Sequence, residues 1–275
     1  MKPITKLSLA ALGAAGAWCA LLCPRRGQPG WDRLAGVRYA HRGLHDPDRG
    51  IPENSMPAFR AAVQHGFGAE LDVHLMADGN LAVVHDSNLS RVCAADVCVE
   101  DLTASELPGY PLMGTCETIP LLEDVLALFE HRTPLIIELK VERGNYNDLT
   151  DRTMKALQGW QGTCCIESFH PAALLRLRQK YPEVLRGQLS QNFLRDSKAA
   201  NLSLPGRFLL TNLLTTGLTK PDFIAYRHQD RNNLSLRLMR RLYGVHEAGW
   251  TVQDERTLRA LELEGVTPIF ERFVP

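Results

Sequence analysis

Two histidines and three carboxylates stand out in this chain because each interrupts or ends a run of apolar residues. The histidines are His41 and His85, and the carboxylates are Glu70, Asp72 and Glu138. Histidine is the side chain that most readily gains and loses a proton near neutral pH. Carboxylates that leave water need a compensating cation, because an unpaired buried charge is costly. The residue types therefore indicate acid–base chemistry beside a bound metal ion.

The spacing of the carboxylates indicates which metal they would bind. Glu70 and Asp72 are two residues apart in an apolar run, so their side chains point to the same face of a strand. In a barrel that face can point inward, and Glu138 on a neighbouring strand would complete the cluster. An all-oxygen cluster suits Mg²⁺ or Ca²⁺ better than Zn²⁺, and the sequence leaves both ions open.

Basic residues next to these positions are suited to binding phosphate. Lys140 repeats the same-face spacing with Glu138, and Arg42 directly follows His41. A guanidinium holds phosphate oxygens in a fork, and Gly43 beside it lets the backbone approach a ligand closely. Any one such residue is as often a salt-bridge partner or a hydrogen-bonded core group. Chance alone does not readily place five of them at the ends of strands.

Short apolar runs alternate with amphipathic stretches from residue 37 onward, which is the pattern of a parallel sheet covered by helices. Eight strands can be counted, so we predict an α/β fold, a (β/α)8 TIM barrel, whose catalytic groups lie at the carboxyl ends of the strands. The predicted strands are 38–41, 69–75, 135–139, 163–168, 186–190, 222–226, 246–252 and 267–270.

Apolar residues spaced three or four apart predict the helices that connect these strands. Ser55 and Asp254 are suitable first residues for two of them, and we interpret Asn54 as a helix cap rather than a site residue. The predicted helices are 56–65, 121–131, 148–160, 172–180, 235–242 and 255–264.

An additional apolar run, residues 81–84, follows Asp78 and Gly79, a pair that favours a tight turn. We predict a β-hairpin after the second strand, centred on this pair. Antiparallel pairing about that centre would place Asp72 roughly opposite His85. The hairpin would thus bring a carboxylate and a histidine together. Between residues 85 and 121 there is room only for a small insertion of about 30 residues.

Composition excludes several classes of protein. The chain has 275 residues, enough for one large domain, and its 31 Lys and Arg residues balance 31 Asp and Glu residues. No overall positive field exists that would attract nucleic acid, so we expect no nucleic-acid partner. The seven cysteines match no zinc-finger spacing, although Cys93 and Cys98 are close enough in sequence to form a disulfide.

The N-terminal segment is apolar on every side. Residues 7–23 carry no charge and are flanked by basic residues. We divide the chain into residues 1–26, a hydrophobic membrane anchor or signal segment, and residues 27–275, the catalytic domain. An uncleaved anchor is favoured because no small-x-small cleavage site lies near the end of the segment. The protein is therefore expected at a membrane, on a side that the flanking charges do not specify.

The motifs together resemble the glycerophosphodiester phosphodiesterase family, from about residue 37 to residue 270. The resemblance rests on motifs that occur in the family's order: His41-Arg42-Gly43, Pro52-Glu53-Asn54-Ser55, Glu70-Leu71-Asp72-Val73, Asp78-Gly79, His85-Asp86, Glu138-Leu139-Lys140, Ser168-Phe169 and Trp250-Thr251-Val252. The end of the chain departs from the pattern, because Ile269-Phe270-Glu271-Arg272-Phe273 stands where the family often has Ile-Thr-Asp-Arg-Pro. This departure bears on substrate detail.

The resemblance implies a role for each matching residue. His41 and His85 would be the acid and base, and one divalent cation, Mg²⁺ or Ca²⁺, would bind Glu70, Asp72 and Glu138. The substrate-binding set would be Arg42, Glu53, Lys140, Phe169 and Trp250, with Glu53 near the metal and the two aromatic residues lining the pocket for the glycerol or the alcohol.

The implied reaction is metal-dependent hydrolysis of a glycerophosphodiester to an alcohol and sn-glycerol 3-phosphate. One histidine would deprotonate the attacking hydroxyl, in this family the glycerol 2-hydroxyl, and the other would protonate the leaving alcohol. An alternative is lysophospholipase D activity on membrane lysophospholipids. A second alternative is a catalytically inactive barrel that binds phosphodiesters. A barrel glycosidase would leave both histidines and Lys140 without roles.

Overall fold

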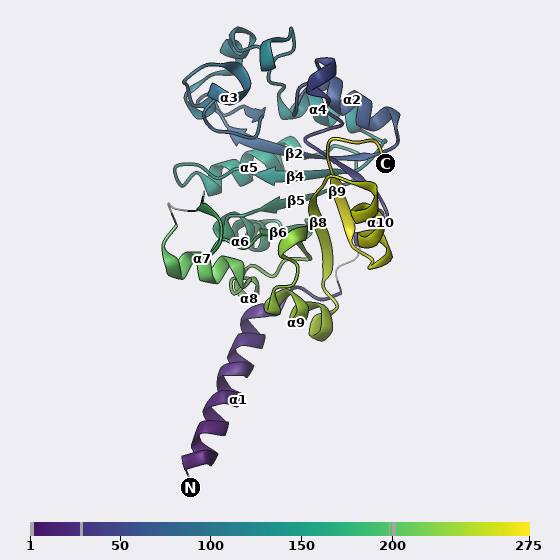
Figure 1. Cartoon of the computed structure of the whole chain (residues 1–275). Coiled ribbons are helices and arrows are strands. Elements are labelled where there is room, and N and C mark those ends of the chain that lie inside the picture. Colours follow the sequence, from purple (N-terminus) through teal and green to yellow (C-terminus); the bar gives the residue numbers. More distant parts are fainter. Residues whose placement is uncertain (1–2, 28–29, 198, 200–201) are drawn as a thin grey trace.

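The computed structural model describes residues 3–27, 30–197, 199 and 202–275, with side chains from residue 12 onward. Eight parallel strands form a closed barrel, because the first strand pairs with both the second and the last (Figure 1). This confirms the predicted barrel. The barrel strands are β1 (Tyr39–His41), β2 (Gly68–Leu75), β4 (Leu135–Leu139), β5 (Cys164–Ser168), β6 (Arg186–Ser190), β7 (Phe223–Arg227), β8 (His246–Val252) and β9 (Thr267–Phe270).

The predicted hairpin is present, but its register differs from the expected one by one residue. Strand β3 (Leu81–Val83) pairs antiparallel with β2 outside the barrel, with Val73 opposite Val83. The loop is centred on Asp78 alone, because the Met76 amide donates to the Asn80 carbonyl. The Val84 amide therefore donates to the Asp72 carbonyl, so Asp72 lies opposite Val84, one residue from the approximate partner that was predicted, His85.

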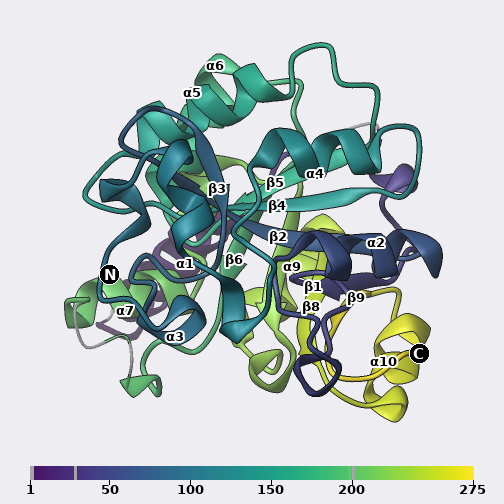
Figure 2. The ribbon, with the colours of Figure 1, turned by 90° about the horizontal axis from the view of Figure 1, so that it is seen from above.

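The six predicted connecting helices are present within a few residues and lie around the strands (Figure 2). They are α2 (Met56–Gln64), α4 (Leu122–Phe129), α5 (Tyr146–Ala156), α6 (Pro171–Lys180), α9 (Leu234–Tyr243) and α10 (Glu255–Leu263).

Two short helices between β6 and β7 were not predicted. They are α7 (Leu204–Thr211) and α8 (Thr216–Thr219). Pro205 and Gly206 resemble a turn in sequence, but a proline in the first helical turn is well tolerated. The Ser203 hydroxyl accepts a hydrogen bond from the Gly206 amide and caps α7.

Two apolar layers hold the barrel and its helices together. Inside the barrel, Tyr39, Ile136 and Phe223 fill the part of the interior below the candidate site. Outside it, residues of alternate parity such as Leu71 and Ile137 pack against the surrounding helices. Because successive side chains of a strand point to opposite faces, the polar residues that share the parity of Ile136 point into the barrel.

The segment between β3 and α4 forms a small insertion. It contains α3 (Ser90–Cys93) and short 3-10 turns at Val99–Asp101, Ala104–Gly109 and Leu112–Gly114. A separate apolar cluster that includes Leu89, Val99 and Leu107 stabilises it.

The N-terminal segment forms helix α1 (Pro3–Leu22), which extends away from the barrel (Figure 1). Residues 1 and 2 of the predicted anchor, and the side chains of residues 3–11, lie outside the described part. Among the residues that the structure describes, no helix is both long enough and apolar enough to cross a membrane. All seven cysteines are free, so Cys93 and Cys98 do not pair in this structure.

Candidate functional site

Strand register places three carboxylates side by side at the carboxyl end of the barrel. Asp72 on β2 pairs with Glu138 on β4, which pairs in turn with Glu167 on β5. Glu70 lies one inward position before Asp72 and pairs with His41 on β1. Paired residues of parallel strands point to the same face, so these side chains share the interior of the barrel.

Glu70, Asp72 and Glu138 form a buried cluster with the donor set of a hard cation. One carboxylate oxygen of each lies within 4.8 Å of the others. Burial, together with the neighbouring carboxylates Asp72 and Glu138, raises the pKa of Glu70 well above its ordinary value. A cation would relieve this repulsion, and oxygen ligands suit Mg²⁺ or Ca²⁺. The residues present therefore fit a divalent cation.

Asp72 stays ionised despite being buried. Burial opposes ionisation, but the nearby positive charges, first Lys140 and then His85 and Arg42, bring the pKa of Asp72 below its ordinary value. The Lys140 Nζ lies 3.1 Å from Glu138 Oε1 and 3.4 Å from Asp72 Oδ1. Lys140 therefore compensates the negative charge of two of the three predicted metal ligands, Glu138 and Asp72.

Glu167 is a fourth buried carboxylate that the sequence reasoning missed. It is 1% exposed, and its Oε2 has no hydrogen-bond partner among the described residues. Burial, followed by repulsion from Glu138 and Asp72, raises its pKa well above the ordinary range. It lies outside the motifs on which the family resemblance rests. Glu167 could have been found from the alternation of side chains along the strand, because Cys165 and Glu167 occupy the inward-facing positions of β5.

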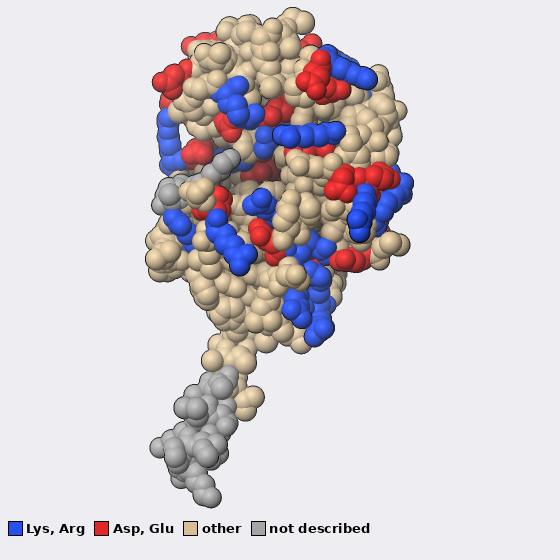
Figure 3. Space-filling view, in the orientation of Figure 1, with Lys and Arg blue, Asp and Glu red and all other residues tan. Residues whose placement is uncertain are grey.

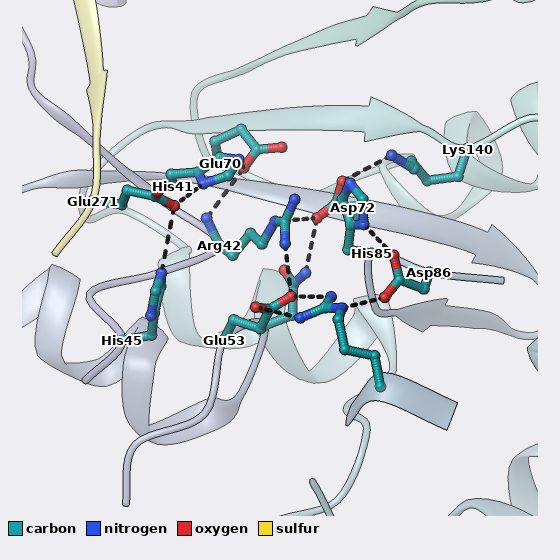
Figure 4. A network of polar contacts seen from close by, with 12 residues as sticks. His41, Arg42, His45, Glu53, Glu70, Asp72, His85, Asp86, Lys140 and Glu271 are labelled. Carbon is teal, nitrogen blue, oxygen red and sulfur yellow. Dashed lines mark hydrogen bonds and ion pairs between the residues drawn. The ribbon is translucent and has the colours of Figure 1, made fainter. Parts of the chain in front are cut away.

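His41 is oriented by a carboxylate from the opposite end of the chain. Its Nδ1 donates to Glu271 Oε2 at 2.8 Å, and its Nε2 lies 3.9 Å from Glu70 Oε2 (Figure 4). The Gln253 side-chain amide donates to the other oxygen of Glu271 at 2.7 Å. Burial lowers the pKa of His41, although Glu271 opposes this shift. The sequence reasoning noted Glu271 only as a departure from the family pattern.

His85 has an equivalent arrangement. Its Nδ1 donates to Asp86 Oδ1 at 2.6 Å, and Asp86 in turn accepts a hydrogen bond from Arg91. The ring of His74 on β2 supports the backbone of His85, because His74 Nε2 donates to the His85 carbonyl at 3.2 Å and its Nδ1 contacts Glu100. Both candidate catalytic histidines are therefore bound by a carboxylate at Nδ1, which leaves Nε2 of each ring for the reaction.

Arg42 links the metal ligands to the loop after β1. Its backbone amide donates to Glu70 Oε2 at 3.1 Å, and its Nη1 donates to Glu53 Oε1 at 2.8 Å. Glu53 also accepts two hydrogen bonds from Arg91. The turn at Arg42 and Gly43 has positive φ angles of 55° and 78°, and a Cβ on Gly43 would lie only 2.9 Å from Ala58. Position 43 therefore requires glycine, both for its positive φ angle and for the close approach to Ala58.

Asn54 contacts the carboxylate cluster and does not cap α2, so its interpretation as a helix cap was wrong. Ser55 caps α2, because its hydroxyl accepts from the Ala58 amide. Asn54 has a positive φ of 50° and directs its side-chain amide to Asp72 Oδ2 at 2.8 Å. The left-handed backbone, which asparagine tolerates, turns the side chain toward the carboxylates.

One cavity of about 110 Å³ brings the predicted site residues together. Phe169 and Trp250 form one wall, with ring centroids 5.6 Å apart in an edge-to-face arrangement. Asp72 and Lys140 contact residues that line the cavity, and Glu53 reaches it through Arg42. The lining residues are His41, Arg42, Glu70, His85, Glu138, Glu167, Phe169, Leu189, Trp250, Thr251 and Ile269.

Comparisons with known proteins agree with this geometry. Residues 41–274 match the model of the Glycerophosphoryl diester phosphodiesterase family. A glycerophosphodiester phosphodiesterase of Bacillus altitudinis is 28% identical over 247 residues, covering 86% of this chain and 94% of the relative. Lysophospholipase D GDPD1 of Rattus norvegicus is 39% identical over 135 residues, covering 44% of this chain and 40% of the relative.

Solved structures share the fold. An Oleispira antarctica phosphodiesterase in complex with the product sn-glycerol-3-phosphate has a TM-score of 0.69 at 21% identity, covering 86% of this chain and 93% of that one. A glycerophosphodiester phosphodiesterase from Thermotoga maritima has a TM-score of 0.63 at 22% identity, covering 86% and 94%. At these identities the likeness concerns the fold alone.

Proposed function

The chain belongs to the glycerophosphoryl diester phosphodiesterase family, and from this premise we propose that it hydrolyses glycerophosphodiesters to an alcohol and sn-glycerol 3-phosphate. His41 and His85 act as base and acid beside a divalent cation bound to Glu70, Asp72 and Glu138. The observation that carries this proposal is the arrangement of two imidazoles, each held at Nδ1 by a carboxylate, around one buried cluster of three carboxylates.

Glu70, Asp72 and Glu138 would hold the cation, which would neutralise charge on the phosphate when bound. Either Mg²⁺ or Ca²⁺ accepts such ligands. Glu167 adds, beside this cluster, a further buried oxygen that has no hydrogen-bond partner in the described part of the chain. Four buried carboxylates exceed the charge that Lys140 and Arg42 compensate, which supports a cation in the working site.

The two histidines divide the proton transfers between them. Burial lowers the pKa of His41, so its ring is neutral near pH 7, as a general base requires. His41 Nε2 accepts the proton of the attacking hydroxyl, and Glu271 stabilises the imidazolium that forms. His85, bound to Asp86, donates a proton from Nε2 to the leaving alcohol oxygen. The proton removed at one side of the phosphate is thus replaced at the other.

Basic and aromatic groups position the substrate. Arg42 Nε is buried 3.5 Å from Asp72 Oδ2, so the guanidinium places its positive charge beside the cluster where a phosphate would bind. Lys140 supplies a second positive charge from β4. The rings of Phe169 and Trp250 cover the side of the cavity where the glycerol or the alcohol would lie.

Lysophospholipase D activity is the second candidate, and an apolar extension of the cavity wall favours it. Phe193 packs edge-to-face on Phe169 with ring centroids 5.9 Å apart, and the neighbouring Leu194 is 46% exposed. These residues continue the wall of Phe169 and Trp250 outward from the site. A lysophospholipid would place its acyl chain along this path, with unchanged chemistry at the phosphate. The apolar N-terminal segment would bring the enzyme to such a substrate at a membrane.

The full chain should be incubated with glycerophosphocholine, glycerophosphoethanolamine and lysophosphatidylcholine, with and without EDTA. Glycerol 3-phosphate is read through a coupled dehydrogenase, and choline release is read for the lysolipid. We expect glycerol 3-phosphate only when Mg²⁺ or Ca²⁺ is present. Choline release from the lysolipid alone would establish the second candidate instead. Failure of every substrate with both metals would mean that the barrel is a binding protein.

A further inference from the structure

Exposed apolar side chains gather at one end of the domain, on α7, α8 and α9. They form what we call the α7–α9 face. Exposed fractions of 42–71% are high for large apolar residues, which normally lose contact with water on folding. The side chains of the α7–α9 face, with their exposed fractions, are Leu204 (71%), Phe208 (43%), Leu209 (42%), Leu218 (56%), Leu234 (62%) and Leu242 (52%).

The end of α1 is firmly seated beside this face. Leu22 is fully buried in a cluster with Leu213 and Met239. Trp18 donates its indole N–H to Ser235 Oγ at 3.1 Å and packs edge-to-face on Phe208, with ring centroids 5.9 Å apart. Helix α1 therefore contacts the α7–α9 face directly.

The end of α1 packs closely on α8. A Cβ on Gly217 would lie 2.7 Å from the Ala20 carbonyl oxygen, so the two backbones touch. The Thr216 hydroxyl and the Lys220 ammonium donate to the carbonyls of Leu21 and Cys23, each at 3.0 Å. The uncharged segment continues outward from this contact as α1, with the α7–α9 face at its base (Figure 1).

The helices that carry this face contain basic residues and no acidic ones, although Glu247 of β8 pairs with Arg240 of α9. Residues 197–221 and helix α9 contain no Asp or Glu, although the whole chain is neutral. Figure 3 shows tan and blue surface, without red, on the part of the domain next to α1. Arg26 lies over the ring of Tyr243 at 5.2 Å, and the hydroxyl of Tyr243 donates to the Cys19 carbonyl. A combination of aromatic, leucine and basic side chains is typical of a surface at the boundary between lipid tails and anionic headgroups.

We propose that the α7–α9 face is a surface that contacts a bilayer of anionic phospholipid. Helix α1, which ends at the edge of this face, enters the same bilayer. The occupant is a lipid surface because α1 carries 17 consecutive uncharged residues, 7–23, outward from this face. A second copy of the chain would leave that segment uncovered. The proposal concerns membrane contact and holds independently of the reaction at the site.

The full chain should be mixed with phosphatidylcholine–phosphatidylglycerol vesicles that contain a diazirine-labelled phosphatidylcholine, irradiated and digested with trypsin. Peptide 208–227 carries Phe208, Leu209 and Leu218, whereas peptide 260–272 carries Leu263, which is 90% exposed on α10. We expect at least about fivefold more lipid adducts on the first peptide, because exposure alone does not bring a residue to the lipid.

A double variant, Leu209→Glu with Leu218→Glu, should lower adduct formation on peptide 208–227 by about fivefold, since charged residues are expelled from lipid. Leu263→Glu is the matched control and should change nothing. Both variants should hydrolyse soluble glycerophosphocholine at the wild-type rate, so loss of membrane contact is separated from loss of activity. Equal labelling of the two peptides, labelling confined to residues 1–23, or crosslinks only between protein copies would overturn the proposal.

Discussion

His41 Nδ1 and Glu271 Oε2 lie 2.8 Å apart although 230 residues separate them in the sequence. Closure of the barrel is responsible, because β9 pairs with β1 and places the residue after its last position beside the end of β1. A carboxylate at Nδ1 fixes which nitrogen carries the proton and leaves Nε2 facing the substrate.

Replacing Glu271 should therefore reduce turnover more than binding. For Glu271→Ala we expect kcat to fall by about 100-fold or more with little change in KM, because the imidazolium loses its stabilising partner. Glu271→Asp should recover part of this loss. Glu123→Gln on the exposed surface of α4 is a suitable control. If kcat/KM of Glu271→Ala fell only because KM rose, with kcat unchanged, Glu271 would merely shape the pocket.

Removal of either candidate catalytic histidine should abolish most activity without unfolding the protein. We expect His41→Ala and His85→Ala each to lower kcat by about 10²–10⁴-fold, the usual contribution of a general acid or base. Circular dichroism should match the wild type, because both side chains lie at the ends of strands rather than in the apolar core. Full activity in either variant would contradict the assignment.

A divalent cation should stabilise the fold through the carboxylate cluster. At a concentration about 100 times Kd, bound Mg²⁺ or Ca²⁺ contributes about 2.7 kcal/mol, which raises Tm by about 5–10 °C in a chain of this length. Glu138→Gln and Asp72→Asn should lose this increase. Glu70→Gln should also raise the Tm of the metal-free protein, since it removes a carboxyl group whose ionisation burial and the neighbouring carboxylates oppose. Differential scanning fluorimetry with and without EDTA measures both effects, and a metal response that survives in all three variants would place the ion elsewhere.

Glu53 should make the stability of the fold depend on acid pH. Burial opposes its ionisation, but hydrogen bonds from Arg91 and the charge of Arg42 lower its pKa from 4.5 to about 2. Because the folded pKa is the lower one, the carboxylate stabilises the fold above pH 4.5, and this contribution is lost as the pH falls toward 2.

The matching variant is Glu53→Gln. It should be less stable than the wild type by about 3 kcal/mol at most at pH 6, because folding lowers the pKa of Glu53 from 4.5 to about 2. The difference in the free energy of unfolding, measured with urea, should shrink steadily between pH 4.5 and pH 2. A difference that stays constant over this range would show that the ion pairs with Arg42 and Arg91 contribute nothing through charge.

Local patterns in the sequence determined the eight barrel strands, the six main helices and the inward face shared by Glu70 and Asp72. Alternation of side chains and helical spacing act over a few residues, so they can be read without a structure. Helices α7 and α8 were not predicted from the sequence, because a proline and a glycine at the start of α7 resemble a turn.

Only the tertiary structure decided which residues meet across the barrel. Glu271 reaches His41 because β9 closes against β1, and Glu167 joins the carboxylates because β5 pairs with β4. The register of the hairpin and the direction of Asn54 depend on a three-residue loop and a left-handed backbone angle. Contacts of this kind depend on register and closure between segments far apart in the chain, and no periodicity within one segment encodes them.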